Sequence, residues 1–529
     1  KSLSRDETTM RILLPTGFWI HKTYHSLAKR IKDVYPEAVF GVFGSKESLS
    51  FLRKICENDS DIEYEIFEID MGRKKDLFEE DIDYDELKKF EEGLPLKSLW
   101  REIARDRGLG GAYNHGAIRS KSKHEGDYKY ILKSFNYVLN QSRDIFNRFN
   151  PDLYVEGVAM GSINAIIFKQ ICNERNIPYI SPSVTRVKSY FAFSDCLQLL
   201  LPQIDKSYLE LLNDYDENDV KFIKAKGLYD IIMNELENPD YFDRINSRFN
   251  IVKYDSPIRK AKWLAGTVFG FMKVIIGAYK NPSNILGSIS YNLQRRIQGL
   301  RLTNPDFADK VDCDRKYIYY PLHANPEYST SVQGTMWIDQ ISVIEALSKS
   351  IPVDWQIYVK EHPGTLVARV RPFSFYNRIR QLPNVSLVPI DMDMHKLVSN
   401  AQMVAVITGT AGWEAVQRGV SSITFADNTW DILGLSKRCA NIETLSKDIY
   451  DEVRRVKQIT LSERRKRIIC YLAAVLRHSF NMTYPNQFVF TDFGTDEEYE
   501  VCGKELADGL IKHLEYLQKE KGYSFGLAV

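Results

Sequence analysis

Polar and turn-forming residues lie at the ends of three strands that we predict in the second half of the chain. These strands cover residues 317–322, 355–361 and 403–408. In open α/β sheets ligands bind outside the carboxyl ends of the strands, so we expect such residues to converge at one edge of the sheet. The residues are His323, Glu327, Lys360, His362, Pro363, Thr408, Gly409, Thr410 and Glu414.

The loop 408–410 lies between a predicted buried strand and a predicted helix. Backbone N–H groups and two hydroxyls would meet there at the positive end of the helix, which suits the phosphate of a nucleotide. Glu414, about one turn further on, is placed to reach a ribose hydroxyl. An alternative stays open, in which Thr410 only caps the helix and Glu414 lies near the offset of a capping box.

His362 can offer an imidazole N–H to a phosphate or leaving-group oxygen, and Pro363 fixes the backbone as the chain leaves the strand. A single histidine at a strand end is more often structural, and this holds for His323 too. The coincidence of both histidines with Lys360 and the 408–410 loop at consecutive strand ends favours a ligand site.

In the first half of the chain, Glu156 follows a predicted strand at 152–155 and is followed by Gly157, which lets a ligand approach the backbone. Its carboxylate can act as the base that takes a proton from an acceptor hydroxyl, or as an acid/base partner in the reaction. The alternative is that Glu156 lies at the start of a helix, where the helix dipole stabilises its negative charge. Arg186 can bind a donor carboxylate with two hydrogen bonds, or it can pair internally.

Two series of short apolar runs that alternate with helical patterns must position these residues. The first series covers residues 11–15, 38–44, 64–70 and 152–157, and the second runs from 317 to 426. Such βαβ alternation predicts an α/β protein with two Rossmann-like domains and additional helical segments. We expect an N-terminal acceptor-side domain, a helical insertion or linker, a C-terminal nucleotide-sugar-binding domain, and C-terminal helices, one of which can cross back to the first domain. Their expected bounds are 1–200, 201–310, 311–440 and 441–529.

Bulk properties exclude several classes of protein. The chain has 529 residues, with 71 Lys+Arg against 70 Asp+Glu, so nothing suggests a nucleic-acid partner. The seven cysteines are single, without a CxxC pair, which argues against a disulfide framework or a zinc site. The N-terminal residues lack the apolar core of a signal peptide, so we expect a cytoplasmic protein.

The segments YIYYPLHANPE, YVKEHPG and VITGTAGWEA, between about residues 316 and 430, resemble the capsule polysaccharide biosynthesis family, which includes the capsular β-Kdo transferases. The His362-Pro363 step and the 408–410 loop are also similar to bacterial GT-B sialyltransferases, in which HP and Ser/Thr motifs hold the CMP phosphate. Glu156-Gly157 resembles the end of their acidic-acidic-glycine motif, although Val155 replaces the first acid.

The resemblance implies a GT-B fold, in which two Rossmann-like domains face a cleft, and a glycosyltransferase. Glu156 and His362 would be catalytic, and the donor would be a CMP-linked sugar such as Kdo or a related nonulosonic acid. The acceptor would be a surface or capsular polysaccharide or its lipid-linked precursor.

We expect neither a metal nor a separate cofactor. Lys360, His362 and the helix end at Thr410 can offset phosphate charge, and we interpret Asp391 and Asp393 as a turn and a helix cap. Two other functions stay open: a nucleotide-sugar epimerase with the same architecture, and a non-catalytic partner in polysaccharide assembly or export.

Residues 256–301 hold an apolar stretch at 263–279 with basic residues on both sides. Lys273 near its middle and its short length argue against a membrane span. Two interpretations are open: a segment that lies on the anionic cytoplasmic face of the inner membrane, or a helical hairpin packed on the N-terminal domain.

Overall fold

In the computed structural model, the chain folds into two compact units. Unit 1 contains Lys1–Leu109, Gly126–Asp214 and Tyr471–Val529, and unit 2 contains Gly110–Glu125 and Tyr215–Cys470. The residues that the structure describes are 9–17, 20–69, 81–106, 108–110, 126–157, 161–237, 265, 272, 285–325, 327–366, 370–485, 494–523 and 525.

Unit 1 is built on a seven-stranded sheet in the order β13-β6-β5-β4-β1-β2-β3. The strands from β5 to β3 are parallel, whereas β6 is antiparallel to both β5 and β13. Their bounds are β1 Arg11–Pro15, β2 Val39–Gly44, β3 Tyr64–Glu68, β4 Leu153–Val155, β5 Tyr179–Val184, β6 Tyr190–Ser194 and β13 Phe480–Asn481.

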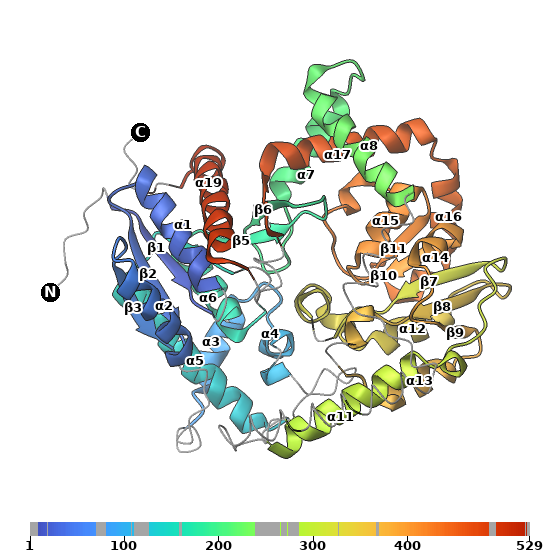
Figure 1. Ribbon diagram of the computed structural model, residues 1–529, viewed down its shortest axis with the longest axis horizontal. Coiled ribbons are helices and arrows are strands. Elements are labelled where there is room, and N and C mark those ends of the chain that lie inside the picture. Colours follow the sequence, from blue (N-terminus) through green and yellow to red (C-terminus); the bar gives the residue numbers. More distant parts are fainter. Residues whose placement is uncertain are drawn as a thin grey trace. The chain divides into compact units, whose positions relative to one another are not determined.

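Helices cover both faces of this sheet (Figure 1). The last helix, α19, packs along α1 although the two are far apart in sequence, and a Cβ added at Gly503 would lie only 2.4 Å from the carbonyl oxygen of Thr23. A glycine is therefore required for this close approach. The helices of unit 1 are α1 Ile20–Val34, α2 Lys46–Asn58, α3 Tyr84–Gly93, α4 Leu99–Arg105, α5 Tyr128–Phe149, α6 Ile163–Arg175, α7 Pro202–Asn213 and α19 Asp496–Lys521.

Unit 2 contains a six-stranded sheet in the order β12-β11-β10-β7-β8-β9, in which all neighbours are parallel. Strand β7 lies between β10 and β8, so the loop after β7 lies between the loops that follow the other two. The bounds are β7 Tyr317–Pro321, β8 Gln356–Lys360, β9 Val385–Val388, β10 Met403–Val406, β11 Ser421–Thr424 and β12 Lys437–Arg438.

Alternate residues of the central strands point to opposite faces of the unit 2 sheet. Ile318 and Tyr320 of β7 pack with α12, α13 and α16 on one face, whereas Tyr317 and Tyr319 pack with α14 and α15 on the other. The helices are α8 Ile223–Glu237, α11 Ile285–Leu302, α12 Gln340–Ser348, α13 Phe373–Arg380, α14 Met394–Asn400, α15 Thr410–Arg418, α16 Leu445–Gln458 and α17 Leu461–His478, the last of which continues into unit 1 at residue 471.

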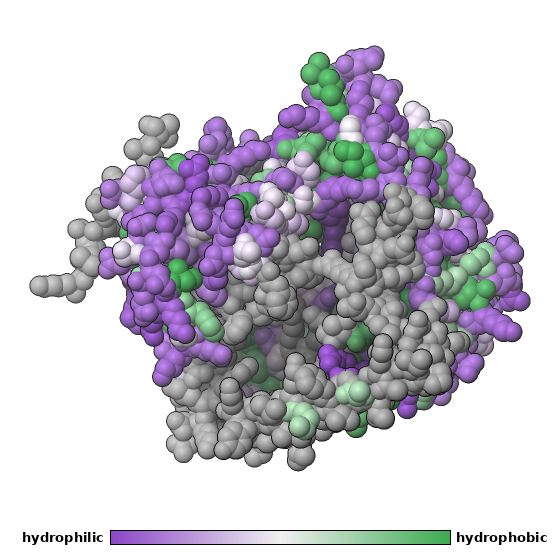
Figure 2. Space-filling model, in the orientation of Figure 1, coloured by the Kyte–Doolittle hydropathy of each residue, from purple (hydrophilic) through white to green (hydrophobic). Residues whose placement is uncertain are grey.

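The predicted fold class is confirmed: both units are α/β and both are built on largely parallel sheets. Most of the apolar stretch at 263–279 lies outside the described residues, so neither interpretation of it is tested. Within the described ranges, no helix combines the length and the apolar character needed to cross a membrane. On the face shown in Figure 2 the described surface is mainly hydrophilic, and hydrophobic side chains gather in a small area near α8.

Candidate functional site

The ends of β10 and β7 bring His323 and the 408–410 loop together, and His362 follows the neighbouring strand β8. The imidazole Nε2 of His323 accepts a hydrogen bond from the backbone N–H of Thr408 at 3.2 Å. A Cβ added at Gly409 would lie 3.1 Å from the same nitrogen, so glycine is the residue that fits against this ring. The predicted convergence of the loops after β7 and β10 is therefore seen directly.

The backbone of His323 is held by a buried side chain of α12. Gln340 accepts from the N–H of His323 at 2.8 Å and donates to its carbonyl oxygen at 3.0 Å. Gln340 is fully buried, and its two bonds fix the start of the loop after β7. The sequence analysis did not single out Gln340, because a glutamine at the start of a helix carries no distinctive pattern.

His362 is partly buried at the end of β8, where Nδ1 accepts from the N–H of Gly364 at 3.0 Å. A neutral imidazole that accepts at Nδ1 carries its proton on Nε2, so Nε2 is a donor. Burial lowers the pKa of His362, the carboxylates of Glu327 and Glu361 oppose this shift, and Arg371 and Lys360 add to it. The neutral tautomer with a proton on Nε2 is therefore favoured near pH 7.

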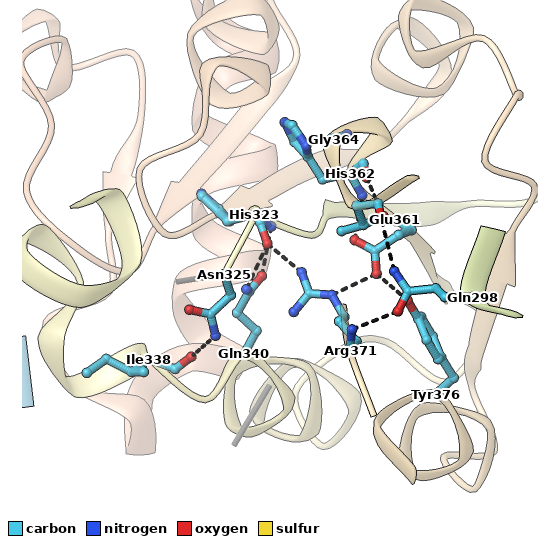
Figure 3. A network of polar contacts seen from close by, with 11 residues as sticks. Gln298, His323, Asn325, Ile338, Gln340, Glu361, His362, Gly364, Arg371 and Tyr376 are labelled. Atoms are coloured by element: carbon cyan, nitrogen blue, oxygen red, sulfur yellow. Dashed lines mark hydrogen bonds and ion pairs between the residues drawn. The ribbon is translucent and has the colours of Figure 1, made fainter. Parts of the chain in front are cut away.

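A buried network that the sequence analysis missed links the two histidine loops (Figure 3). Glu361 accepts from the N–H of His362 at 2.7 Å through Oε1, and from Nε of Arg371 and the hydroxyl of Tyr376 at 2.7 Å each through Oε2. Arg371 also donates through Nη2 to the carbonyl oxygen of His323. One carboxylate and one guanidinium thus fix both loops relative to each other.

Lys360 ends β8 and is 5% exposed. Burial lowers its pKa to about 8, against the opposing effect of the carboxylates of Asp391, Glu361 and Asp393. Among the described residues no carboxylate forms an ion pair with its ammonium group. Asp393 is the N-cap of α14, where it accepts from the N–H of His395 at 2.8 Å, so the prediction of a helix cap is confirmed there.

The N-terminus of α15 has no capping side chain in the part of the chain that the structure describes. Gly409 is the N-cap, and Thr410 is the first helical residue and is exposed. The alternative in which Thr410 caps the helix is therefore wrong. The N-terminus of α15 therefore follows directly on Thr408 and Gly409, which lie against the ring of His323.

Glu414 is not placed with the two histidines. It is buried between α14 and α15, and its Oε2 lies 3.6 Å from Nδ1 of His395. Burial raises its pKa to about 7, and the neighbouring Arg418 opposes this shift. Its contacts give no support to a ribose-binding role, which stays a prediction.

The other predicted residues of unit 2 lie close to His362. Pro363 begins a short 3₁₀ turn whose Thr365 donates to the carbonyl oxygen of His362 at 2.8 Å. Glu327 accepts from the hydroxyl of Ser329 at 3.4 Å, and its carboxylate lies near enough to His362 to raise the pKa of that imidazole.

In unit 1, Glu156 directly follows β4 and is 3% exposed. Its carboxylate accepts from the hydroxyl of Tyr154 at 2.7 Å and from the N–H of Gly157 at 2.8 Å. Burial raises its pKa to about 7, although both hydrogen bonds lower it. The group therefore changes its protonation state near neutral pH, as an acid or base in catalysis must.

Arg186 lies in the turn between β5 and β6, with a φ of 64°. This left-handed conformation is uncommon for a residue with a side chain, and Lys188 in the same turn shares it with a φ of 49°. The role of Arg186 in binding a donor carboxylate stays a prediction.

Residues 277–455 match the family model described as "Capsule polysaccharide biosynthesis protein". Over these residues, about a third of the chain, the sequence is similar to the capsule polysaccharide biosynthesis family. This region includes β7 to β11, both histidines and the Arg371 network. The match therefore relates the part of the chain that carries the candidate site to proteins of capsule polysaccharide biosynthesis.

Several solved structures resemble the chain at low sequence identity. Thermosulfurimonas dismutans KpsC, a β-Kdo 2,7 transferase, is 9% identical, with 94% of this chain and 99% of that chain covered and a TM-score of 0.34. The UDP-GlcNAc 2-epimerase from Neisseria meningitidis is 10% identical, with 95% and 100% covered and a TM-score of 0.26. No curated protein sequence matches the chain. The likeness to the capsule polysaccharide biosynthesis family lies in residues 277–455 and does not depend on these structures.

Proposed function

We propose that the protein is a metal-independent glycosyltransferase that transfers a sugar to a growing capsular polysaccharide or its lipid-linked precursor. The donor would be a CMP-linked sugar, Kdo or a related nonulosonic acid. The observation that carries the proposal is the contact between His323 and the loop before the uncapped N-terminus of α15, at the carboxyl edge of the unit 2 sheet where His362 follows the neighbouring strand β8.

The donor phosphate would bind at this edge. The first N–H groups of α15 and the hydroxyl of Thr410 offer hydrogen bonds, and the helix dipole favours a negative group. Lys360 supplies positive charge, because its pKa of about 8 leaves most of the ammonium groups protonated at pH 7. These groups support the binding of a phosphate at this edge.

His362 would stabilise the negative charge on the leaving phosphate with a hydrogen bond. The proposed step breaks the bond between the anomeric carbon and the phosphate oxygen, and its electron pair stays on that oxygen. The Nε2–H of His362 donates to this oxygen, and the new bond forms between the anomeric carbon and an acceptor hydroxyl. Nδ1 accepts a hydrogen bond from the N–H of Gly364, and this bond fixes the orientation of the ring.

Glu156 would take the proton from the acceptor hydroxyl. With a pKa of about 7 the carboxylate is partly ionised at neutral pH, and its ionised form is the base. Arg186 would bind the carboxylate of the donor sugar, because a guanidinium pairs with a carboxylate through two parallel hydrogen bonds. Both roles rest on residue chemistry and on the family resemblance.

The proposal is tested by incubating the protein with CMP-Kdo and a capsular oligosaccharide, and by measuring both released CMP and glycan length. We expect CMP release to match glycan growth, without added metal and in the presence of a chelator. Conversion of a nucleotide sugar into its epimer without glycan growth would instead indicate an epimerase. Neither product would indicate a non-catalytic partner.

A cytoplasmic protein that meets a lipid-linked acceptor would work at the inner face of the membrane. The basic residues on both sides of 263–279 support peripheral binding to anionic lipid. Co-sedimentation with anionic and neutral vesicles at low and high salt tests this. We expect the protein to bind only to anionic vesicles and to bind them less well at high salt. Equal binding to anionic and neutral vesicles would contradict peripheral binding through the basic residues.

A further inference from the structure

Arg371 also lines a cavity of about 210 Å³ that contains neither histidine. One side of this cavity is formed by α11, and the other by Phe307 and residues 370–376. Drug-sized ligands generally occupy pockets of roughly 300–1,000 Å³. A space of this size therefore suits a single ring rather than a whole nucleotide.

The walls combine flat apolar surfaces with polar groups. Phe307, Phe373 and Tyr376 supply aromatic rings, and Phe373 is 42% exposed. Gln294 and Arg301 of α11 add an amide and a guanidinium, and no described residue of the lining is acidic. Such a surface fits a ligand with an apolar face and a negatively charged group.

Two guanidinium groups lie on these rings. Arg301 lies over Phe373 and Arg380 lies over Phe307, each at 4.3 Å from the ring centroid. Neither arginine has a carboxylate partner in the described ranges, and both are exposed. Arg378 on the same helix as Arg380, by contrast, pairs with Glu345 at 2.9 Å. In the part of the chain that the structure describes, no carboxylate therefore neutralises the charges of Arg301 and Arg380.

We infer that this cavity binds a pyranose ring that carries a carboxylate, as part of the glycan acceptor. The C–H face of the ring would pack on Phe373, and the carboxylate would pair with the planar guanidinium of Arg301. This inference rests on the proposed function, because a capsular acceptor is what would supply such a ring. It adds an acceptor subsite that is distinct from the donor edge.

The position of Arg371 relates this subsite to the donor edge. Its side chain lines the cavity, donates to the carbonyl oxygen of His323 and pairs with Glu361, which holds the N–H of His362. A sugar in the cavity would thus lie against the same residue that fixes both histidine loops.

The test is calorimetric titration of D-glucuronate, with D-glucose as the uncharged probe, into the full chain. Arg301→Gln removes the charge at the cavity, and Arg454→Gln, an exposed arginine of α16 outside the lining, is the matched control. We expect glucuronate to bind the wild type and Arg454→Gln equally, and Arg301→Gln at least about tenfold more weakly. Glucose should bind the wild type more weakly than glucuronate does. Equal glucuronate binding by Arg301→Gln and the wild type, or no binding to the wild type, would overturn the inference.

Competition separates this inference from the proposed function. CMP should leave glucuronate binding unchanged, because the two ligands are assigned to different residues. Displacement of glucuronate by CMP would overturn the acceptor subsite and leave a donor site in its place. Failure of CMP, UDP and GDP to bind, with charge-dependent glucuronate binding intact, would overturn the proposed function and leave the cavity as an acidic-sugar site.

Discussion

Nε of Arg371 lies 2.7 Å from Oε2 of Glu361, and the two side chains are only 1% and 3% exposed. Such a pair is held in place by further hydrogen bonds, here from Tyr376 and from the backbone of His362 to the same carboxylate. It joins the loops that follow β7 and β8, which carry the two histidines of the candidate site. The pair therefore holds the geometry of the site.

Glu361→Ala should lower the stability of the protein strongly, because it leaves the buried guanidinium of Arg371 without its carboxylate. Loss of one partner of a buried ion pair costs about 3–5 kcal/mol, which corresponds to a melting temperature lower by roughly 6 °C or more for a unit of this size. Thermal melting measures the change. The double variant Glu361→Met with Arg371→Met should recover part of the loss, and a double variant less stable than Glu361→Ala would contradict the assignment.

Gly409→Ala should weaken nucleotide binding, because the new Cβ would lie 3.1 Å from Nε2 of His323 and push the ring or the loop aside. Gly227→Ala is the matched control, since nothing lies within 4 Å of a Cβ at that helical position. The control should bind nucleotide normally and be about 0.5–1 kcal/mol more stable, as expected for alanine in a helix. Equal nucleotide affinity in both variants would argue against contact between the loop and the ligand.

Two substitutions of His362 separate its two ring nitrogens. Asparagine places an acceptor near Nδ1 and can keep the bond from Gly364, whereas it has no group at Nε2. His362→Asn should therefore melt like the wild type but turn over about 100-fold more slowly or worse. His362→Gln places a donor near Nε2 and should retain more activity. Turnover of His362→Asn near the wild-type value would exclude this residue as the hydrogen-bond donor to the leaving oxygen.

The stability of unit 1 should depend on pH through Glu156. Burial raises its folded pKa to about 7 from an ordinary value near 4.5, so the folded state holds a proton that the unfolded state has lost between these values. The stabilising contribution is complete below about pH 4.5, falls as the pH rises towards 7 and levels off above it. Glu156→Gln resembles the protonated form and should lack this fall.

Thermal melting of both proteins at pH 5 and pH 8 measures this effect. The difference between wild type and Glu156→Gln should shift in favour of the variant at pH 8, while contributions from Glu414 cancel because both proteins contain it. Turnover of Glu156→Gln should fall about 100-fold or more with donor binding preserved, as expected for loss of a general base. A pH-independent difference would mean that Glu156 titrates at an ordinary pKa.

The apolar periodicity of the sequence was enough to predict the sheets and the meeting of the strand ends. The predicted strand 403–408 contains β10, Met403–Val406, and the loop after it meets His323 as expected from parallel strands. The prediction holds because the carboxyl ends of parallel strands lie at the same edge of a sheet, independently of which side chains the strands carry.

The sequence pattern could not predict the direction of individual side chains or the pairing of residues that lie far apart in the chain. Arg371 contacts residues 10 and 48 positions away, Glu361 and His323, and nothing in the local sequence specifies such partners. Glu414 was assigned to the sheet edge by its distance from Thr410, but the rotation along α15 directs it towards α14 and His395. A single turn of helix thus decides whether a residue belongs to the site.

The most direct test of the account is calorimetric titration of CMP into the wild type and into Thr410→Leu. Thr410 is exposed at the first position of α15, so leucine there should leave the melting temperature within about 1 °C while it removes a hydroxyl and crowds the proposed phosphate position. The account predicts that CMP binds the wild type more tightly than UDP or GDP, and that Thr410→Leu binds it at least about tenfold more weakly. Equal CMP affinity in the two proteins, or no CMP binding to the wild type, would contradict it.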